Sequence, residues 1–382
     1  MNAAAPASSP GTAPVDWVAL AHRLGPGFAA RAATADEGDE FVAVNYAELK
    51  AHRVLSAGVP AEFGGGGASH RELCAMLRAY ARYCGSTALA LSMHTHNVAA
   101  AAWRWRHDKA PTEPLLRRVA AEQIVLISTG GADWLKSIGT ATRVDGGYRI
   151  DARKGFASGL PAGDLLMTSA VADDPQNGPT VLHFALPVSS PGVAIDRRWR
   201  ALGMRGTGSN DAVIAGVFVP DQAISGRRPQ GKWHRLFHII TMMAFPAIYS
   251  VYVGIAEAAR AIALDCAAKR AGDGDVVLAT GEMENELAVA RLALDDMIAC
   301  AEAAEPGPAT TSRIFVGRTL AGRGAIRTVE KAMEAAGGAA MYRSLGLERL
   351  FRDVQAARYH PLQEKAQLRL AGRVALGLDI DG

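Results

Sequence analysis

The sequence is poor in the residues that mark several protein classes. Only four of its 382 residues are cysteines, and they form no CxxC pair and no cluster with histidine. This scarcity argues against a disulfide framework or a zinc site and fits reduced thiols in a cytoplasmic protein. His234 and His238 lie four residues apart, as two ligands on one helical face would, but no third ligand accompanies them. We therefore expect no metal.

An excess of charge of either sign is also missing. The chain has 41 basic and 38 acidic residues, which gives a formal net charge of +3, and 6% of its residues are aromatic. Its charges are dispersed and do not form a basic stripe with interleaved aromatics, so we expect no nucleic-acid partner.

Long apolar runs are absent as well. The longest, Ile239 to Ile255, is interrupted by Pro246 and Gly254 and is shorter than the ~20 residues that a membrane span requires. It predicts a buried helix and no membrane segment. Residues 1–16 are rich in Ala, Ser and Pro and lack the basic start and apolar run of a signal peptide, which predicts a disordered tail.

The composition that remains, 49% hydrophobic and 21% charged, is that of a globular protein with room for two or three domains. Residues 17–123 show helical periodicity, broken once by the glycine-rich segment 58–67. Short β-rich runs fill residues 124–226 and predict a sandwich or barrel. Residues 227–382 return to helical periodicity and predict a bundle. The four long helices of this bundle are expected at 236–270, 280–304, 309–336 and 347–376. The fold class is α+β.

Three motifs occur along this chain in a recognisable order. They are Val59-Pro-Ala-Glu-Phe-Gly-Gly65, Leu202-Gly-Met-Arg-Gly-Thr207, and Gly337-Gly338 followed by Glu348-Arg-Leu-Phe-Arg-Asp353. Their order and separation resemble those of the acyl-CoA dehydrogenase family over nearly the whole chain. The resemblance implies a flavoprotein with an N-terminal helical domain, a middle β-domain and a C-terminal four-helix bundle. It also implies a homotetramer formed through the bundles, and FAD more than FMN as the cofactor.

The resemblance further implies where the flavin binds. Ser128-Thr129-Gly130-Gly131 stands at the first flavin loop, although the Glu-Pro pair usual in the family is absent. In the second loop, Phe156 takes the place of the aromatic that packs against the flavin, followed by Ala157, and Ser158 takes that of a hydroxyl near flavin N5. Each loop can also be read as a plain turn beside a core aromatic.

The C-terminal part of the resemblance carries one departure. Gly337 and Gly338 match the turn that approaches the flavin of a neighbouring subunit, and they are equally an ordinary helix C-cap. After Arg270 the family usually continues with Phe-Gly, in a site for the FAD pyrophosphate, whereas this chain continues Ala271-Gly272. Anchoring of the adenine half is therefore in doubt, and FMN becomes an alternative.

The catalytic glutamate of the dehydrogenases is also missing. Dehydrogenation of an acyl thioester needs a carboxylate to remove the Cα proton. One family location for this base holds the Tyr359-His360-Pro361 region and the other holds Ala244. Glu364 is a candidate for a relocated base, or a residue of a helix surface.

A second branch of the family consists of two-component flavin monooxygenases, which take reduced flavin from a separate reductase. They often carry a histidine near this C-terminal position and a serine or threonine at the flavin, and His360 and Ser158 match these places. Imidazole exchanges protons near neutral pH. The alternative is an interfacial or helix-capping histidine.

Further candidates line the expected substrate pocket. His94 and His96 lie two apart in a helical region and so point to different faces, which disfavours a shared metal. Phe245 and Tyr249 belong to the apolar stretch that would form the pocket wall, which suits an apolar or acyl-type small molecule.

Three functions stay open from the sequence. The first is a monooxygenase-like enzyme with Ser158 and His360 at the flavin. The second is an FAD-dependent acyl-CoA dehydrogenase with Glu364 as base, served by an electron-transfer partner. The third is a catalytically silent family member that binds flavin or acyl groups.

Overall fold

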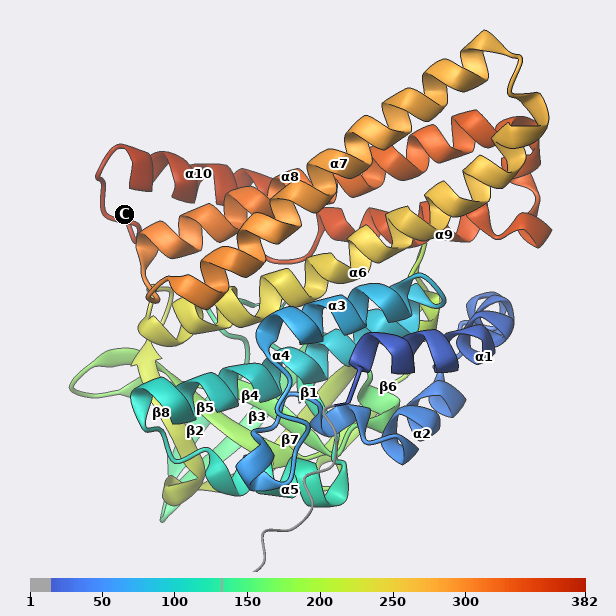
Figure 1. Ribbon diagram of the computed structural model, residues 1–382. Helices are drawn as coiled ribbons and strands as arrows, with labels where there is room; N and C mark the ends of the chain where they lie inside the picture. Colours follow the sequence, from blue (N-terminus) through green and yellow to red (C-terminus); the bar gives the residue numbers. More distant parts are fainter. Residues whose placement is uncertain (1–14, 132) are drawn as a thin grey trace, which may run out of the picture.

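The computed structural model describes residues 15–131 and 133–382 of the chain. The tail expected at 1–16 therefore lies outside the described residues except for its last two positions, and Ala132 of the first flavin loop also lies outside them. The described elements form an N-terminal helical part, a central sheet and a set of C-terminal helices (Figure 1).

The N-terminal helices bury the apolar faces that the sequence indicates. In α3, Leu73, Leu77 and Tyr80 are buried, and a capping box between Ser69 and Glu72 starts the helix. The helices are α1 (Trp17–Glu37), α2 (Ala43–Ala51), α3 (His70–Ala81), α4 (Gly85–Asp108) and α5 (Glu113–Glu122).

The glycine-rich break contains two short 3-10 helices, η1 (Val54–Ser56) and η2 (Ala61–Phe63). A Cβ on Gly65 would lie 2.3 Å from the carbonyl oxygen of Val59, and one on Gly66 would lie 2.3 Å from the ring of Trp17. Only glycine allows the chain to fold back this closely. The first motif of the sequence is thus a packed turn beneath α1.

The middle part is one mixed sheet in the order β6-β7-β3-β2-β4-β5-β8, with β1 beside β4. Most neighbours are antiparallel, while β1 runs parallel to β4 and pairs Ser128 with Met167. The strands are β1 (Leu126–Ser128), β2 (Thr140–Val144), β3 (Gly147–Ala157), β4 (Leu165–Asp174), β5 (Gly178–Pro187), β6 (Val193–Asp196), β7 (Asn210–Pro220) and β8 (Ile224–Pro229).

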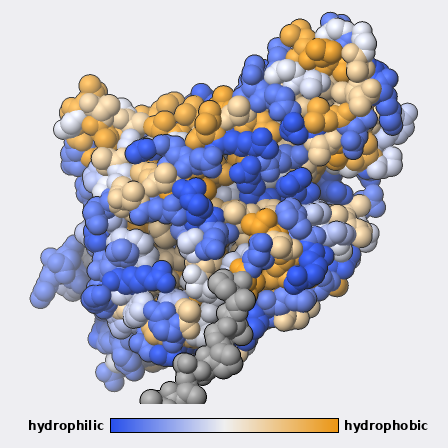
Figure 2. Space-filling model, in the orientation of Figure 1, coloured by the Kyte–Doolittle hydropathy of each residue, from blue (hydrophilic) through white to orange (hydrophobic). Residues whose placement is uncertain are grey.

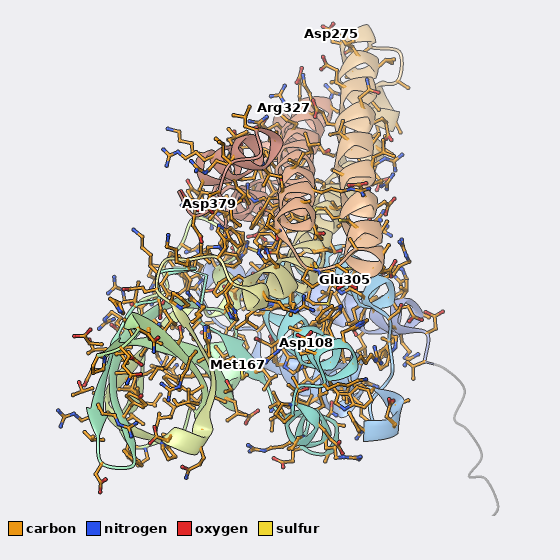
Figure 3. The ribbon with its side chains drawn as sticks, turned by 90° about the vertical axis from the view of Figure 1, so that its left-hand side faces the viewer. Asp108, Met167, Asp275, Glu305, Arg327 and Asp379 are labelled. Carbon is orange, nitrogen blue, oxygen red and sulfur yellow. The ribbon has the colours of Figure 1, made fainter. Side chains whose placement is uncertain are left out.

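The C-terminal part is built on three long helices, α6 (Arg235–Ala267), α7 (Gly274–Ala303) and α8 (Pro308–Ala336). The segment 235–270, with α6, is long and apolar enough to cross a membrane, but 94% of its apolar window is buried inside the protein. It is a core helix, as the interrupted apolar run predicts. In Figure 3 the pair α7 and α8 projects away from the sheet, with Asp275 at the far end and Glu305 at the near end of α7.

The fourth long helix, expected at 347–376, is not continuous. The chain forms α9 (Leu347–Val354), a 3-10 turn η9 (Gln355–Arg358), a loop, and then α10 (Glu364–Ala375). Pro361 falls in this loop, where its ring cannot continue a helix. The interruption places His360 in a loop against the long helices.

The parts join along α6 and α4. Helices α3 and α4 pack against α6 on one side, and α4 also contacts β1 (Figure 1). The second and third sequence motifs meet here: the backbone N–H of Met204 donates to the buried carboxylate of Asp353. A Cβ on Gly203 would lie 2.3 Å from the carbonyl oxygen of Arg352. Two motifs some 150 residues apart therefore form one contact between sheet and bundle.

Candidate flavin and substrate site

His360 is held by two side chains from different helices. Its Nδ1 is hydrogen-bonded to the hydroxyl of Tyr252 on α6. Its carbonyl oxygen accepts a bond of 2.7 Å from Nη2 of Arg318 on α8. Burial, together with the smaller effect of the Arg318 charge, lowers the pKa of His360 to about 4. The imidazole is therefore neutral at physiological pH.

Arg318 fixes the whole turn that ends at His360. The guanidinium is buried, and Nη2 also lies 3.2 Å from the carbonyl oxygen of Ala357 and 3.4 Å from that of Arg358. Both carbonyls lie at the end of η9, where they have no partner within the helix itself. Tyr249 adds a hydroxyl bond of 2.9 Å to the same Ala357 carbonyl. No local pattern in the sequence points to Arg318, because this residue contacts His360 only through the tertiary fold.

The two histidines of α4 have different surroundings. His94 is fully satisfied: its Nδ1 accepts from the N–H of Leu126 (3.0 Å) and its Nε2 donates to the carbonyl of Leu55 (2.7 Å). It ties α4 to the sheet and does not line a site. His96 donates from Nδ1 to the carbonyl of Ser92 (3.0 Å), and a charge on His96 would lower the pKa of His360. Burial lowers the pKa of His94 and of His96 to about 4.

An aromatic row connects His360 to the first flavin loop. Ring centroids lie 5.7 Å apart for His360 and Tyr252, 5.4 Å for Tyr252 and Tyr249, and 6.3 Å for Tyr249 and Phe245. Phe245 then meets Trp134 at 6.0 Å. Both predicted pocket residues, Phe245 and Tyr249, belong to this row. They are fully buried, so a substrate reaches them only if neighbouring side chains move.

The first flavin loop is anchored by a buried ion pair. Nζ of Lys154 lies 2.7 Å from Oδ2 of Asp133, and both side chains are almost completely buried. Burial lowers the pKa of Lys154, while Asp133 opposes this shift. The same Oδ2 accepts from the N–H of Ile138 (2.7 Å). Arg228, also buried, donates to the carbonyl of Trp134 (3.3 Å).

The residues of this loop fit the pyrimidine edge of a flavin. A Cβ on Gly130 or Gly131 would meet nothing within 4 Å, so the backbone is open to a planar ring. Oδ1 of Asp133 and Nε1 of Trp134 are buried without a partner among the described residues. Oδ1 of Asp133 can accept a hydrogen bond, and Nε1–H of Trp134 can donate one. The pyrimidine edge of a flavin has an N–H and carbonyl oxygens that would be the matching partners.

The residues at the start of this loop are less open. Ser128 is the last residue of β1 and pairs with Met167, which is labelled in Figure 3. Thr129 is buried, and its hydroxyl donates to Oγ1 of Thr168 (2.8 Å). The side chain of Thr129 is thus already used within the sheet.

The second flavin loop places its residues on two sides of the chain. Phe156 is 64% exposed, has a positive φ of 56°, and meets the ring of Trp199 edge-on. Ala157 is buried at the end of β3. Ser158 is buried, and its hydroxyl bonds to that of Ser209 (2.7 Å). An exposed aromatic in a strained conformation is the feature here that a ligand would explain.

Ser158 and His360 lie against different helices. The Cβ position of Gly159, next to Ser158, lies 3.8 Å from Ala90 on α4, whereas His360 is hydrogen-bonded to Tyr252 on α6. The structure thus brings both loops and His360 to the layer beneath α4 and α6, without direct contact between Ser158 and His360 among the described hydrogen bonds.

The remaining candidates lie at the surface. Glu364 begins α10 and pairs with exposed Arg323 through a bond of 3.0 Å, and Arg323 lowers its pKa. Gly337 has a positive φ of 67° and caps α8 beside Arg270, and the Cβ position of Gly338 is open. Glu364 thus has the surroundings of a helix-surface residue, and the two glycines lie at or near the surface of the chain.

Besides Arg318, the site residues that the sequence did not single out are Tyr252 and the Lys154–Asp133 pair. Tyr252 follows Tyr249 by three residues in a helix, which is the spacing of one helical face. This spacing is a usable signal. The ion pair joins residues 21 apart across a strand and a loop, and no local pattern predicts it.

Fold and site together define a family. Residues 26–118 match the acyl-CoA dehydrogenase N-terminal domain and residues 247–364 match the acyl-CoA dehydrogenase C-terminal domain. The chain belongs to the acyl-CoA dehydrogenase superfamily, as the three motifs predict.

Individual relatives carry several activities. The putative acyl-CoA dehydrogenase YdbM of Bacillus subtilis (strain 168) is 28% identical over 376 residues, 92% of this chain and 94% of that protein. The amino sugar nitrososynthase DnmZ of Streptomyces peucetius is 29% identical over 350 residues, 86% of this chain and 85% of the relative. A dibenzothiophene monooxygenase of Rhodococcus erythropolis is 28% identical over 268 residues, 64% and 60% of the two chains.

The fold of this chain matches that of a solved structure over nearly its whole length. KijD3 in complex with FMN and dTDP-3-amino-2,3,6-trideoxy-4-keto-3-methyl-D-glucose superimposes with a TM-score of 0.87 at 26% identity. The match covers 98% of this chain and 96% of KijD3.

Proposed function

We propose that this protein is a flavin-dependent oxidoreductase of the monooxygenase-like branch, which uses reduced flavin and oxygen. The observation that carries the proposal is His360. A neutral, half-buried imidazole, fixed by Tyr252 and Arg318, stands in the region where the dehydrogenases place a glutamate. The similarity to a nitrososynthase and to a dibenzothiophene monooxygenase supports the same branch.

The chain's own groups suit this chemistry. Bound reduced flavin would supply the electron pair that activates oxygen. Gly130, Gly131 and the free polar atoms of Asp133 and Trp134 would hold its pyrimidine edge. His360 would donate or accept a proton beside the bound flavin, since a neutral imidazole has one donor and one acceptor nitrogen. The aromatic row would exclude water from the same space.

The dehydrogenase alternative has weaker support in the structure. Similarity to YdbM favours it, but Ala244 has no acidic group and Glu364 is committed to Arg323 at the surface. A base that is paired with a cation and partly exposed is poorly placed to remove a proton from a buried substrate.

We further propose FMN as the flavin, in place of the FAD that the family resemblance favours. KijD3 binds FMN, and the segment after Arg270 lacks the Phe-Gly pair that belongs to the family's pyrophosphate site. Arg270 itself donates to the carbonyl of Ala335 at the end of α8 (2.6 Å). A small, largely apolar substrate, a separate flavin reductase, a homotetrameric assembly and a cytoplasmic location complete the proposal.

Flavin binding and redox response test the proposal. The purified protein is titrated with oxidised and reduced FMN and FAD, and extracted flavin is identified. We expect weak retention of oxidised flavin and tighter binding of reduced FMN. Tightly bound FAD that is bleached by acyl-CoA esters would instead identify a dehydrogenase. Failure to bind either flavin would identify a silent family member.

A further inference from the structure

The hydroxyl of Tyr252 has a single described partner. Tyr252 is fully buried in the middle of α6, and burial raises its pKa well above the ordinary value, so it stays a protonated phenol. Among the described residues its oxygen is hydrogen-bonded only to Nδ1 of His360. A buried phenol must place its proton on an acceptor or bear the cost of desolvation.

The direction of this bond determines the tautomer of His360. If Nδ1 carried the proton, it would donate to the Tyr252 oxygen, and the phenolic proton would have no acceptor among the described residues. If Nδ1 is unprotonated, the phenol donates to it and both groups are satisfied. The second arrangement puts the proton of the neutral ring on Nε2.

His96 has the opposite arrangement. Its Nδ1 lies 3.0 Å from the Ser92 carbonyl, which can only accept, so Nδ1 carries the proton and Nε2 is an unprotonated acceptor. Burial lowers the pKa of both rings to about 4. The two neutral imidazoles therefore differ in the nitrogen that has no described partner: a donor Nε2–H on His360 and an acceptor Nε2 on His96.

We propose that Tyr252 is a positioning residue that fixes His360 as an Nε2–H donor. This inference rests on the proposed function for its catalytic meaning, because the Nε2–H is then the group that His360 offers to a flavin or a substrate.

The tautomers can be measured without flavin or turnover. The full-length protein is labelled with ¹⁵N-histidine, and the ring signals of His360 and His96 are assigned with His360→Gln and His96→Gln. We expect His360 to be protonated at Nε2 in the unmodified protein, His96 at Nδ1, and a mixture of tautomers for His360 in Tyr252→Phe. A wild-type His360 protonated at Nδ1, or an unchanged His360 in Tyr252→Phe, overturns the inference.

Tyr249→Phe is the matched control for this measurement. It removes a buried hydroxyl from the same helix, three residues away, whose bond goes to the Ala357 carbonyl and not to the imidazole. The His360 tautomer should stay unchanged in this variant. A shift as large as in Tyr252→Phe would show that the effect is general loosening of the turn, which also overturns the inference.

The catalytic consequence is tested separately. In Tyr252→Phe we expect reduced-flavin binding within about twofold of the unmodified protein and a rate of the proton-dependent step lowered about tenfold. Its pH profile should also be altered. If flavin does not bind at all, the proposed function fails, while the tautomer result still stands or falls by itself. If flavin binds and the rate and pH profile of Tyr252→Phe are unchanged, the positioning role fails.

Discussion

At the scale of single residues, His94, His96 and His360 are held neutral by their surroundings but differ in how many ring nitrogens have partners. His94 uses both ring nitrogens to join α4 to the backbone of two other elements, whereas His96 and His360 each keep one nitrogen free of described partners. The sequence shows that these positions are histidines in helical or loop context. It does not show which nitrogens are occupied, because the partners are backbone groups and side chains from 4 to more than 100 residues away.

A first prediction concerns acid stability. The pKa of His94 is about 4 in the folded protein against 6.5 in the unfolded chain, so His94 contributes stability that is complete above pH 6.5 and is lost as the pH falls toward 4. The loss amounts to about 3 kcal/mol of unfolding free energy. Denaturant unfolding of the wild type and His94→Gln between pH 7 and 4 measures it. The variant should show a shallower decline with pH, and parallel curves would contradict the assignment.

A second prediction concerns the ion pair under the first flavin loop. Lys154→Met leaves the buried carboxylate of Asp133 without its cation and should lower the free energy of unfolding by about 3–5 kcal/mol. The double variant Lys154→Met with Asp133→Leu removes both charges and should recover most of this loss. Chemical denaturation measures the free energy of unfolding of the wild type and of both variants. A single variant that costs less than about 1 kcal/mol would show that the pair is not buried as described.

At the scale of elements, the three sequence motifs are contacts between elements rather than parts of one. The glycines of the first motif fold a turn onto α1, and the second and third motifs meet where Gly203 touches the backbone of α9. Element types could be predicted because periodicity is local. The prediction of one continuous helix over 347–376 was wrong, because the segment divides into α9 and α10. Pro361 is a local stop signal, but the depth at which the loop inserts depends on Arg318 of another helix.

A third prediction tests this contact. In Gly203→Ala the new Cβ would lie 2.3 Å from the Arg352 carbonyl oxygen and 2.6 Å from the Asp353 nitrogen, so backbone must shift. We expect a loss of about 1–3 kcal/mol in the free energy of unfolding. Gly281→Ala is the control, since it lies exposed in α7 and its Cβ would meet nothing within 4 Å. That change should stabilise by about 0.5–1 kcal/mol. Equal effects of the two substitutions would contradict the close contact.

At the scale of the whole molecule, the bundle carries an apolar surface that one chain leaves uncovered. Leu278 and Leu292 on α7, Leu376 beside α10, and Met341 and Tyr342 after α8 are all exposed. Figure 2 shows hydrophobic side chains along the outer edge of the bundle. An exposed apolar surface of this kind is typical of a protein interface. The fold class could be predicted from the order of the helical and β-rich segments and of the motifs. The assembly could not, because it depends on which faces remain exposed after folding.

A fourth prediction concerns this assembly. Sedimentation equilibrium at micromolar concentration should give a mass four times the 40.1 kDa of one chain. Leu292→Glu should weaken the assembly, whereas Leu202→Glu, which changes an equally exposed leucine in the loop before β7, should leave it intact. A stable monomer of the unmodified protein would contradict the homotetramer.

The central claim is that this protein uses His360 to direct the reaction of reduced flavin with oxygen. The most direct measurement mixes anaerobic protein and reduced FMN with oxygenated buffer and follows flavin absorbance and oxygen together. We predict that the unmodified protein consumes oxygen well before the absorbance of oxidised flavin returns, and that His360→Gln abolishes this lag while still binding reduced flavin. Simultaneous oxygen consumption and flavin reoxidation in the unmodified protein, at the rate of free reduced FMN, would contradict the account.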